Sequence, residues 1–277
     1  MERLPRHGVV EAPGKLVLLG EYAVLDDAPA VVAAVDRGVR CVVSPGDGVI
    51  TPGDDRFVRA GLQGAPRALY TFSDANPPAD IDGKPGFGGS AAATVAAVIA
   101  AGMPLHTAAE IHAAVQGGGS GIDVFASLLG GVHRFRDAMP MSCPPMVAVW
   151  SGQSASTGPR VLQYLAWSGR RAFVAESERL VQAFETEPIP AVREAYVLLR
   201  HMSAAAGIAY DLPAFAATAK LAEAHGGAAK PSGAGGGDIA VALLPDPDAL
   251  AAFNRAAAEA ALRTIDVRVA PPAGWVG

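Results

Sequence analysis

The pattern of hydrophobic and polar positions divides the chain into a strand-rich first part and a helix-rich second part. Near the N-terminus, short apolar and β-branched runs alternate with Gly, Pro and Asp, which is typical of strands joined by turns. This pattern predicts strands at 9–12, 15–19, 30–36 and 39–44. Residues 45–85 are rich in Pro, Gly and Asp and predict loops with at most short strands.

The pattern changes abruptly after residue 88. An Ala-rich run of high helix propensity predicts a helix over 91–101, and further helices are expected at 107–115 and 122–129. Glycine-rich turns precede the first and the third of these helices. Because the unpaired N–H groups and the positive dipole end of a helix start face such a turn, a turn of this kind is a candidate phosphate site.

The second half shows apolar residues at helical spacing with charges between them. The expected elements are helices at 160–185, 191–206 and 212–225, a buried strand at 238–244, a helix at 247–262 and a final strand at 264–269. Alternation of helix and strand at the end of the chain is typical of a small α+β domain. We therefore expect an α+β protein with two domains, 1–148 and 149–277.

Composition and charge exclude several classes of protein. The 277 residues are 51% hydrophobic and 18% charged, which predicts a packed core, and the net charge of −5 argues against a nucleic acid or an anionic membrane as partner. The two cysteines, Cys41 and Cys143, form neither a disulfide framework nor a zinc-ligand pattern. With no signal peptide and no bilayer-spanning apolar run in the sequence, we expect a soluble cytoplasmic protein.

The positive charges are distributed unequally between arginine and lysine. Of the 22 basic residues, only four are lysines, namely Lys15, Lys84, Lys220 and Lys230. Since the compact ammonium group and the planar guanidinium group differ in size and donor geometry, the retained lysines indicate positions that need an ammonium group. A composition bias that leaves four surface lysines explains the same count.

Three glycine-bearing segments carry the candidate chemistry. They are residues 12–25 (APGKLVLLGEYAVL), 84–92 (KPGFGGSAA) and 230–238 (KPSGAGGGD). The middle segment scans as a GxGxxA dinucleotide fingerprint, but it lacks the strand and acidic partner of a βαβ unit. A GxxxxGK[ST] P-loop is absent from the sequence. By their composition, the two glycine-rich loops are able to present backbone N–H groups to an anion.

Together and in this order, the three segments resemble the motifs of the GHMP kinase superfamily of galactokinase, homoserine kinase, mevalonate kinase and phosphomevalonate kinase. The resemblance spans nearly the whole chain. It implies an N-terminal domain like ribosomal protein S5 domain 2, a C-terminal ferredoxin-like domain and an active-site cleft between them. It also implies that ATP binds in this cleft, that the middle loop holds the nucleotide phosphates, and that catalysis needs Mg²⁺.

Within the superfamily, the chain looks most like the phosphomevalonate kinases. The stretches that resemble them are Lys84 ahead of the middle loop, IHAAVQGGGSGIDV at 111–124, WSGQSAST at 150–157 and KPSGAGGGD at 230–238. His112 stands where mevalonate kinases carry a magnesium-binding Glu. The resemblance therefore implies transfer of the γ-phosphoryl group of ATP to the 5-phosphate of mevalonate 5-phosphate, a step of isoprenoid synthesis.

The resemblance assigns roles to individual residues. Asp123 is expected to be the catalytic carboxylate, as a base or as an electrostatic organiser, with Lys15 beside it; a plain helix N-cap is the other interpretation of Asp123. The nucleotide is expected to contact Lys84, Gly86, Phe87, Gly88, Gly89, Ser90 and Ala91. Ser90 is also a candidate magnesium ligand, or a simple helix cap. The acceptor is expected to contact Ser154, Ser156, Thr157, Lys230, Ser232, Gly233, Ala234, Gly235, Gly236 and Asp238.

Several of these residues have simpler explanations. The group at 154–157 is equally explained as a turn and cap before a helix, and Asp238 as a turn residue between a loop and a strand. Glu21 and Tyr22 are expected to be structural. For His112 we expect packing or solvation rather than catalysis, and for Lys220 an exposed helix position.

A phosphate acceptor changes what the site has to do. Its second pKa is about 6, so at neutral pH it is mostly a dianion and already has its nucleophile. The difficulty is to bring two polyanions together, and cations are the remedy. Lys15, Lys84 and Lys230, together with magnesium, are the candidates. Asp123 would then chiefly position Lys15 or the metal.

Two departures from the family pattern keep other functions open. Gly89 replaces the first of two serines that are usual in the middle loop, and the region 45–85, where relatives build much of the adenine pocket, is short. The alternatives are another GHMP kinase, acting on mevalonate, its 3-hydroxyl or a sugar, and a non-catalytic nucleotide- or metabolite-binding homologue. We expect a monomer or a homodimer.

Overall fold

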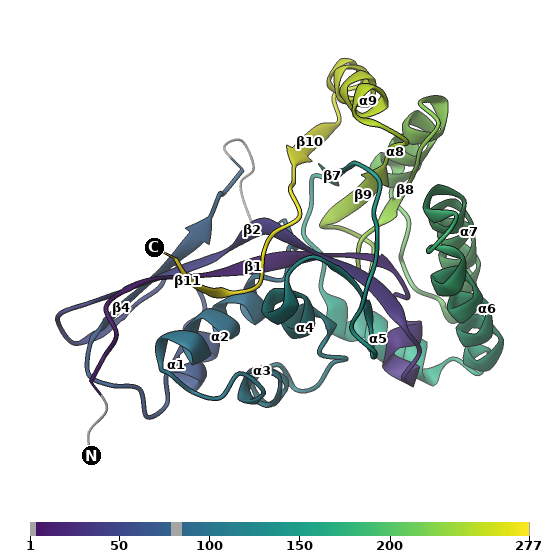
Figure 1. Ribbon diagram of the computed structural model, residues 1–277. Helices are drawn as coiled ribbons and strands as arrows, with labels where there is room; N and C mark the ends of the chain where they lie inside the picture. The colour runs from purple at the N-terminus through teal and green to yellow at the C-terminus, as the bar shows by residue number, and fades with distance from the viewer. Residues whose placement is uncertain (1–3, 79–84, 277) are drawn as a thin grey trace.

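The computed structural model describes residues 4–78 and 85–276, which form two β-sheets with helices packed on them (Figure 1). The first sheet comprises β1 (Gly8–Leu19), β2 (Ala30–Ser44), β3 (Gly48–Ile50), β4 (Leu69–Ala75), β5 (Val132–Phe135), β6 (Met139–Pro140) and β11 (Gly274–Val276). The second comprises β7 (Met146–Trp150), β8 (Ala228–Pro231), β9 (Ile239–Leu243) and β10 (Arg263–Asp266). The predicted α+β fold class is confirmed.

Two groups of helices accompany the sheets. The first group is α1 (Arg56–Gly61), α2 (Gly89–Ala100), α3 (Thr107–Gln116) and α4 (Ile122–Leu129). The second is α5 (Thr157–Ala166), α6 (Arg170–Ala183), α7 (Pro188–Ala206), α8 (Pro213–Ala224) and α9 (Pro247–Glu259), and the short 3₁₀ helix η1 (Ala23–Asp26) follows β1. No helix within 4–78 or 85–276 combines the length and the apolar character that a membrane crossing requires.

The long antiparallel strands β1 and β2 replace the four short strands that the sequence predicts. Both interruptions contain a glycine, Gly14 on β1 and Gly38 on β2. The register of the pair shifts here, because Ala12 pairs with Val39 whereas Gly14 pairs with Val35. A Cβ atom on Gly14 would lie 1.9 Å from the Arg37 carbonyl oxygen, and one on Gly38 would lie 2.0 Å from the Ala12 carbonyl oxygen. The glycines therefore permit a close backbone approach and do not end the strands.

The described part of the region 45–85 contains more regular structure than the sequence predicts. It forms β3, α1 and the seven-residue β4, which pairs antiparallel with β2. Tyr70 and Phe72 on β4 are buried in the same core as α2. The Pro, Gly and Asp residues that predict loops lie mainly between these elements, where turn residues are favoured.

In the second half, the predicted helix 160–185 is two helices, α5 and α6. The chain turns between them at Gly169, where a Cβ atom would lie 2.2 Å from the Trp167 ring. The structure also adds β8, which the sequence analysis does not predict, beside the predicted strand β9. The domain division at 148/149 stays a prediction; position 148 lies inside β7 of the second sheet, and β11 pairs with β1 of the first.

We predict that Gly14→Ala destabilises the protein by about 1–3 kcal/mol, because the added methyl group overpacks the contact between β1 and β2. Urea unfolding followed by circular dichroism measures the effect. Gly158→Ala is the matched control: this α5 glycine has nothing within 4 Å of the added Cβ, so the change should stabilise by about 0.4–1 kcal/mol. Equal stability of the two variants would contradict the close-approach explanation.

Candidate active site

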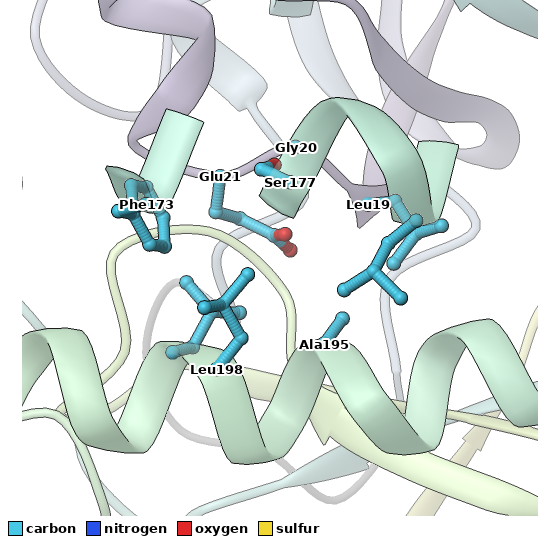
Figure 2. Close-up of a pocket in the computed structure, with 9 residues that line it drawn as sticks. Leu19, Gly20, Glu21, Phe173, Ser177, Ala195 and Leu198 are labelled. Carbon is cyan, nitrogen blue, oxygen red and sulfur yellow. The ribbon is translucent and has the colours of Figure 1, made fainter. Parts of the chain in front are cut away.

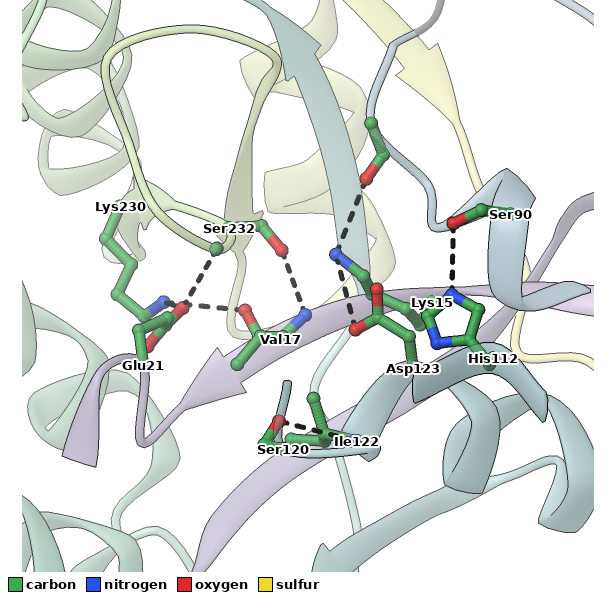
Figure 3. A network of polar contacts seen from close by, with 12 residues as sticks. Lys15, Val17, Glu21, Ser90, His112, Ser120, Ile122, Asp123, Lys230 and Ser232 are labelled. Atoms are coloured by element: carbon green, nitrogen blue, oxygen red, sulfur yellow. Dashed lines mark hydrogen bonds and ion pairs between the residues drawn. The ribbon is translucent and has the colours of Figure 1, made fainter. Parts of the chain in front are cut away.

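Lys15 and Asp123, the two residues predicted to be catalytic, lie side by side (Figure 3). Lys15 is on β1, and Asp123 is in the first turn of α4. The Lys15 Nζ atom is 3.9 Å from Asp123 Oδ1 and 3.5 Å from the Gly86 carbonyl oxygen. The lysine side chain is 10% exposed and the aspartate side chain 33% exposed, so the ammonium group is largely shielded while the carboxylate reaches solvent.

The backbone of the middle segment closes over this pair. The Lys15 N–H group donates a 2.8 Å hydrogen bond to the Phe87 carbonyl oxygen, which fixes the loop to β1. Gly88 has φ +77°, and a Cβ atom there would lie 3.1 Å from Lys15 Cγ and 3.3 Å from Asp123 Oδ2. Glycine at this position thus permits both the left-handed turn and the close approach. Because Gly88 also caps α2, the first N–H groups of that helix lie beside Lys15.

Ser90, in the first turn of α2, is joined to His112 on α3. The Ser90 Oγ atom is 3.2 Å from His112 Nε2, and the imidazole ring packs 5.3 Å from the Phe57 ring. Burial lowers the pKa of His112, although the Asp123 charge acts in the opposite direction. The imidazole is therefore neutral at neutral pH. The sequence does not predict that His112 contacts the site. A signal that could have indicated its burial is the helical spacing of His112 and Ala108, which share the buried face of α3.

The first residues of the third segment contact β1 and the residues that follow it. Lys230 is fully buried, and its Nζ atom contacts Glu21 Oε1, the Pro231 carbonyl oxygen at 3.0 Å and the Val17 carbonyl oxygen at 3.4 Å. Ser232 Oγ accepts a 2.9 Å hydrogen bond from the Val17 N–H group. A contact of Lys230 with the acceptor stays a prediction; the structure gives its ammonium group partners within the protein.

The end of the third segment meets the middle segment at Asp238. A Cβ atom on Gly86 would lie 2.6 Å from Asp238 Cβ, so the two loops touch. Asp238 Oδ1 accepts a 3.1 Å hydrogen bond from the Ala155 N–H group. Burial raises the pKa of Asp238, while this hydrogen bond and the charges of Lys15 and Arg160 act to lower it. Asp238 therefore lies within the electrostatic reach of Lys15.

Arg160 on α5 is a site residue that sequence analysis missed. Its guanidinium group donates to the Ser156 carbonyl oxygen at 2.6 Å, to the Gly236 carbonyl oxygen at 3.4 Å and to the Ala209 carbonyl oxygen at 3.1 Å. It thus joins the segment 154–157 to the glycine loop. The signal in the sequence is that Arg160 is the one charged residue of α5.

The remaining predicted site residues that the structure describes fall into three groups. Phe87, Gly89 and Ala91 accompany Ser90 around the first turn of α2, and Ser154, Ser156 and Thr157 are exposed at the start of α5. Gly233, Ala234, Gly235 and Gly236 form the β8–β9 loop. Lys84 lies outside the described residues, and Lys220 is exposed on α8.

The oxygen groups of the site suit a hard cation such as Mg²⁺. Within the part of the chain that the structure describes, no group of three or more His, Cys, Asp and Glu residues is arranged to hold a metal ion. Magnesium, however, is usually bound by one or two protein oxygens together with substrate phosphates and water. The Ser90 hydroxyl group and the Asp123 carboxylate are of the required type.

We predict that His112 makes stability depend on pH. Since burial lowers its pKa in the folded state, the unfolded chain binds the proton first, and stability falls as the pH falls below about 6.5. His112→Gln should therefore give a shallower loss of stability between pH 7 and pH 5, measured from urea midpoints. Ser90→Ala keeps the buried imidazole and should retain the wild-type slope. An unchanged slope in His112→Gln would rule out this linkage.

Comparison with known proteins gives relatives along most of the chain. No family model matches. A phosphomevalonate kinase from Streptomyces sp. (strain CL190) is 28% identical over 334 aligned positions, covering 85% of this chain and 89% of that protein. A mevalonate kinase from Methanothermobacter thermautotrophicus is 33% identical over 144 positions, covering 44% and 48% of the two chains.

Solved structures share the fold. The Lin0012 protein from Listeria innocua matches with a TM-score of 0.82 at 20% identity, over 95% of this chain and 97% of that chain. The Streptococcus pneumoniae phosphomevalonate kinase, solved with phosphomevalonate and AMPPNP, matches with a TM-score of 0.73 at 17% identity, over 95% and 99%. A curated relative aligned along most of the sequence, together with this shared fold, makes the chain similar to the ATP-dependent small-molecule kinases of the GHMP superfamily.

Proposed function

We propose that this protein is a GHMP kinase, and specifically a phosphomevalonate kinase, which transfers the γ-phosphoryl group of ATP to the 5-phosphate of mevalonate 5-phosphate. The products are mevalonate 5-diphosphate and ADP. The observation that carries the proposal is the placement of the Lys15 ammonium group between the Gly86 carbonyl oxygen and the Asp123 carboxylate, where the glycine turn begins α2. The 28% identical phosphomevalonate kinase supports the choice of acceptor.

The nucleotide phosphates would bind at the start of α2. Gly86 and Gly88 have positive φ angles, and the N–H groups of the first turn, together with the helix dipole, attract an anion. The Ser90 hydroxyl group, held by His112, lies in the same turn. Magnesium bound with ATP would neutralise charge on the β- and γ-phosphates, and Ser90 and Asp123 are the residues that would hold it.

The acceptor phosphate would bind between Lys15 and the glycine loop that ends at Asp238. One of its oxygens forms a new bond to the γ-phosphorus, the bond from that phosphorus to the bridging oxygen breaks, and ADP leaves with the electron pair. Since the acceptor is already a dianion, no proton has to be removed. Lys15 would offset the repulsion between the two polyanions, and Asp123 would hold its ammonium group in place.

Mevalonate kinase is the second candidate, because a relative with that activity is 33% identical over 44% of this chain. The neighbour of Ser90 argues against it. That neighbour is the neutral imidazole of His112, and magnesium prefers oxygen ligands to nitrogen ligands. A site that holds magnesium through a carboxylate at this position would carry an acidic residue in place of His112.

We predict turnover with mevalonate 5-phosphate and none with mevalonate or a panel of sugars, measured by coupled ADP release. Lys15→Ala should lower kcat/KM about 10²- to 10³-fold, because it removes a charge that the transition state needs. Asp123→Asn should lower kcat, because it loosens the position of Lys15 and removes a carboxylate charge that would hold magnesium.

Lys220→Ala, at an exposed position of α8, is the control and should retain wild-type kinetics. Turnover with mevalonate but not with its 5-phosphate would overturn the proposed acceptor. ATP binding without turnover of any acceptor would identify a non-catalytic homologue.

A further inference from the structure

A buried ion pair joins the end of the first sequence segment to the start of the third. Lys230 has no exposed surface and Glu21 is 4% exposed, and their charged groups are in direct contact (Figure 3). The lysine Nζ atom also donates to the Pro231 and Val17 carbonyl oxygens. An ammonium group has three donors, so Lys230 is fully satisfied where it lies.

Further contacts hold the beginning of the glycine loop at successive positions. The Gly233 N–H group donates to Glu21 Oε1 at 3.4 Å, and the Val17 N–H group donates to Ser232 Oγ at 2.9 Å. The Tyr22 hydroxyl group donates to the Ala234 carbonyl oxygen at 2.6 Å. Residues 232–234 are therefore tied to residues 17–22, and the ion pair lies at the centre of these contacts.

Glu21 lines a small pocket, and none of the other residues that line this pocket is charged (Figure 2). Lys230 is therefore not replaced by another charged partner on this side of the carboxylate. The carboxylate points into a cavity of about 10 Å³, which has room for one water molecule, and Ser177 is the polar side chain that shares it. The other lining side chains are apolar: Leu19, Phe173, Leu180, Ala195, Leu198 and Leu199. An ion pair enclosed in this way has one geometry, unlike an exposed pair whose long side chains exchange partners.

This geometry is transmitted to the candidate active site through β1. Lys15 lies two residues before Val17 on the same strand, and the glycine loop runs from Ser232 to Asp238, which touches Gly86. The loop thus has one end fixed to β1 through Val17, and to the residues just after β1 through the ion pair with Glu21, and the other end beside the middle segment. A change at Glu21 or Lys230 would move the loop relative to the Lys15 ammonium group.

We propose that Glu21 and Lys230 are positioning residues for phosphoryl transfer, and that their buried pair holds the loop 232–238 at the distance from Lys15 that the reaction needs. The proposal rests on the proposed function insofar as this loop binds the acceptor. Phosphoryl transfer is catalysed mainly by positioning and electrostatics, so a small displacement of the acceptor lowers the rate.

The test compares Glu21→Gln, Lys230→Met and the double variant E21Q/K230M with the wild-type protein. The single variants leave one buried charge unpaired and are expected to be less stable; the double variant leaves none and keeps the fold. In the double variant we expect kcat to fall at least tenfold with the KM for ATP within twofold. Amide hydrogen exchange at residues 233–237, measured without ligands, should be at least tenfold faster.

The exposed ion pair Arg179–Glu194 on α6 and α7 supplies the control, and R179M/E194Q should match the wild type in every measurement. A folded E21Q/K230M variant with wild-type kcat would overturn the proposal, because the pair would then serve the fold alone. Unchanged exchange in the loop would also overturn it. If the wild-type protein phosphorylates no acceptor, the proposed function fails, while loop exchange still decides whether the pair holds the loop.

Discussion

The antiparallel pairing of β1 with β2 is the constraint on which the rest of the molecule depends. The strands remain continuous only because Gly14 and Gly38 permit carbonyl oxygens to approach where a Cβ atom would collide. Lys15 follows Gly14 directly, its N–H group holds the middle loop through Phe87, and Val17 holds the third segment through Ser232. β1, which belongs to the first segment, therefore holds the middle and third segments beside it, although the three segments are far apart in sequence.

The lysines show how burial gives one residue type different roles. Lys15 is largely shielded but lies beside the partly exposed Asp123, at the start of a helix that favours anions. Lys230 is enclosed with Glu21, and its charge serves the contact between the glycine loop and the residues that follow β1. Lys220 is exposed on α8. A count of lysines treats these residues alike, because desolvation and partners are set by tertiary structure.

Three groups that attract an anion lie close together at the candidate active site. They are the positive end of α2, the Lys15 ammonium group and the Ser90 hydroxyl group. Each of them alone is common in proteins, since glycine turns and serines are frequent at helix starts. Their combination with the partly exposed carboxylate of Asp123 makes the region suited to a polyanion. The acidic net charge of the whole chain does not oppose this, because a local arrangement of donors and cations decides the potential felt by a small ligand.

The sequence by itself determined the fold class, the main helices of both halves and the three segments that meet at the site, because hydrophobic period and glycine-rich turns are local signals. It did not determine β8, whose residues 228–231 show no alternation and form a strand through pairing with β9. It also did not determine the partners of Lys230, His112 and Arg160. Those contacts join residues up to 213 positions apart, and only the packing of the two sheets and their helices brings such residues together.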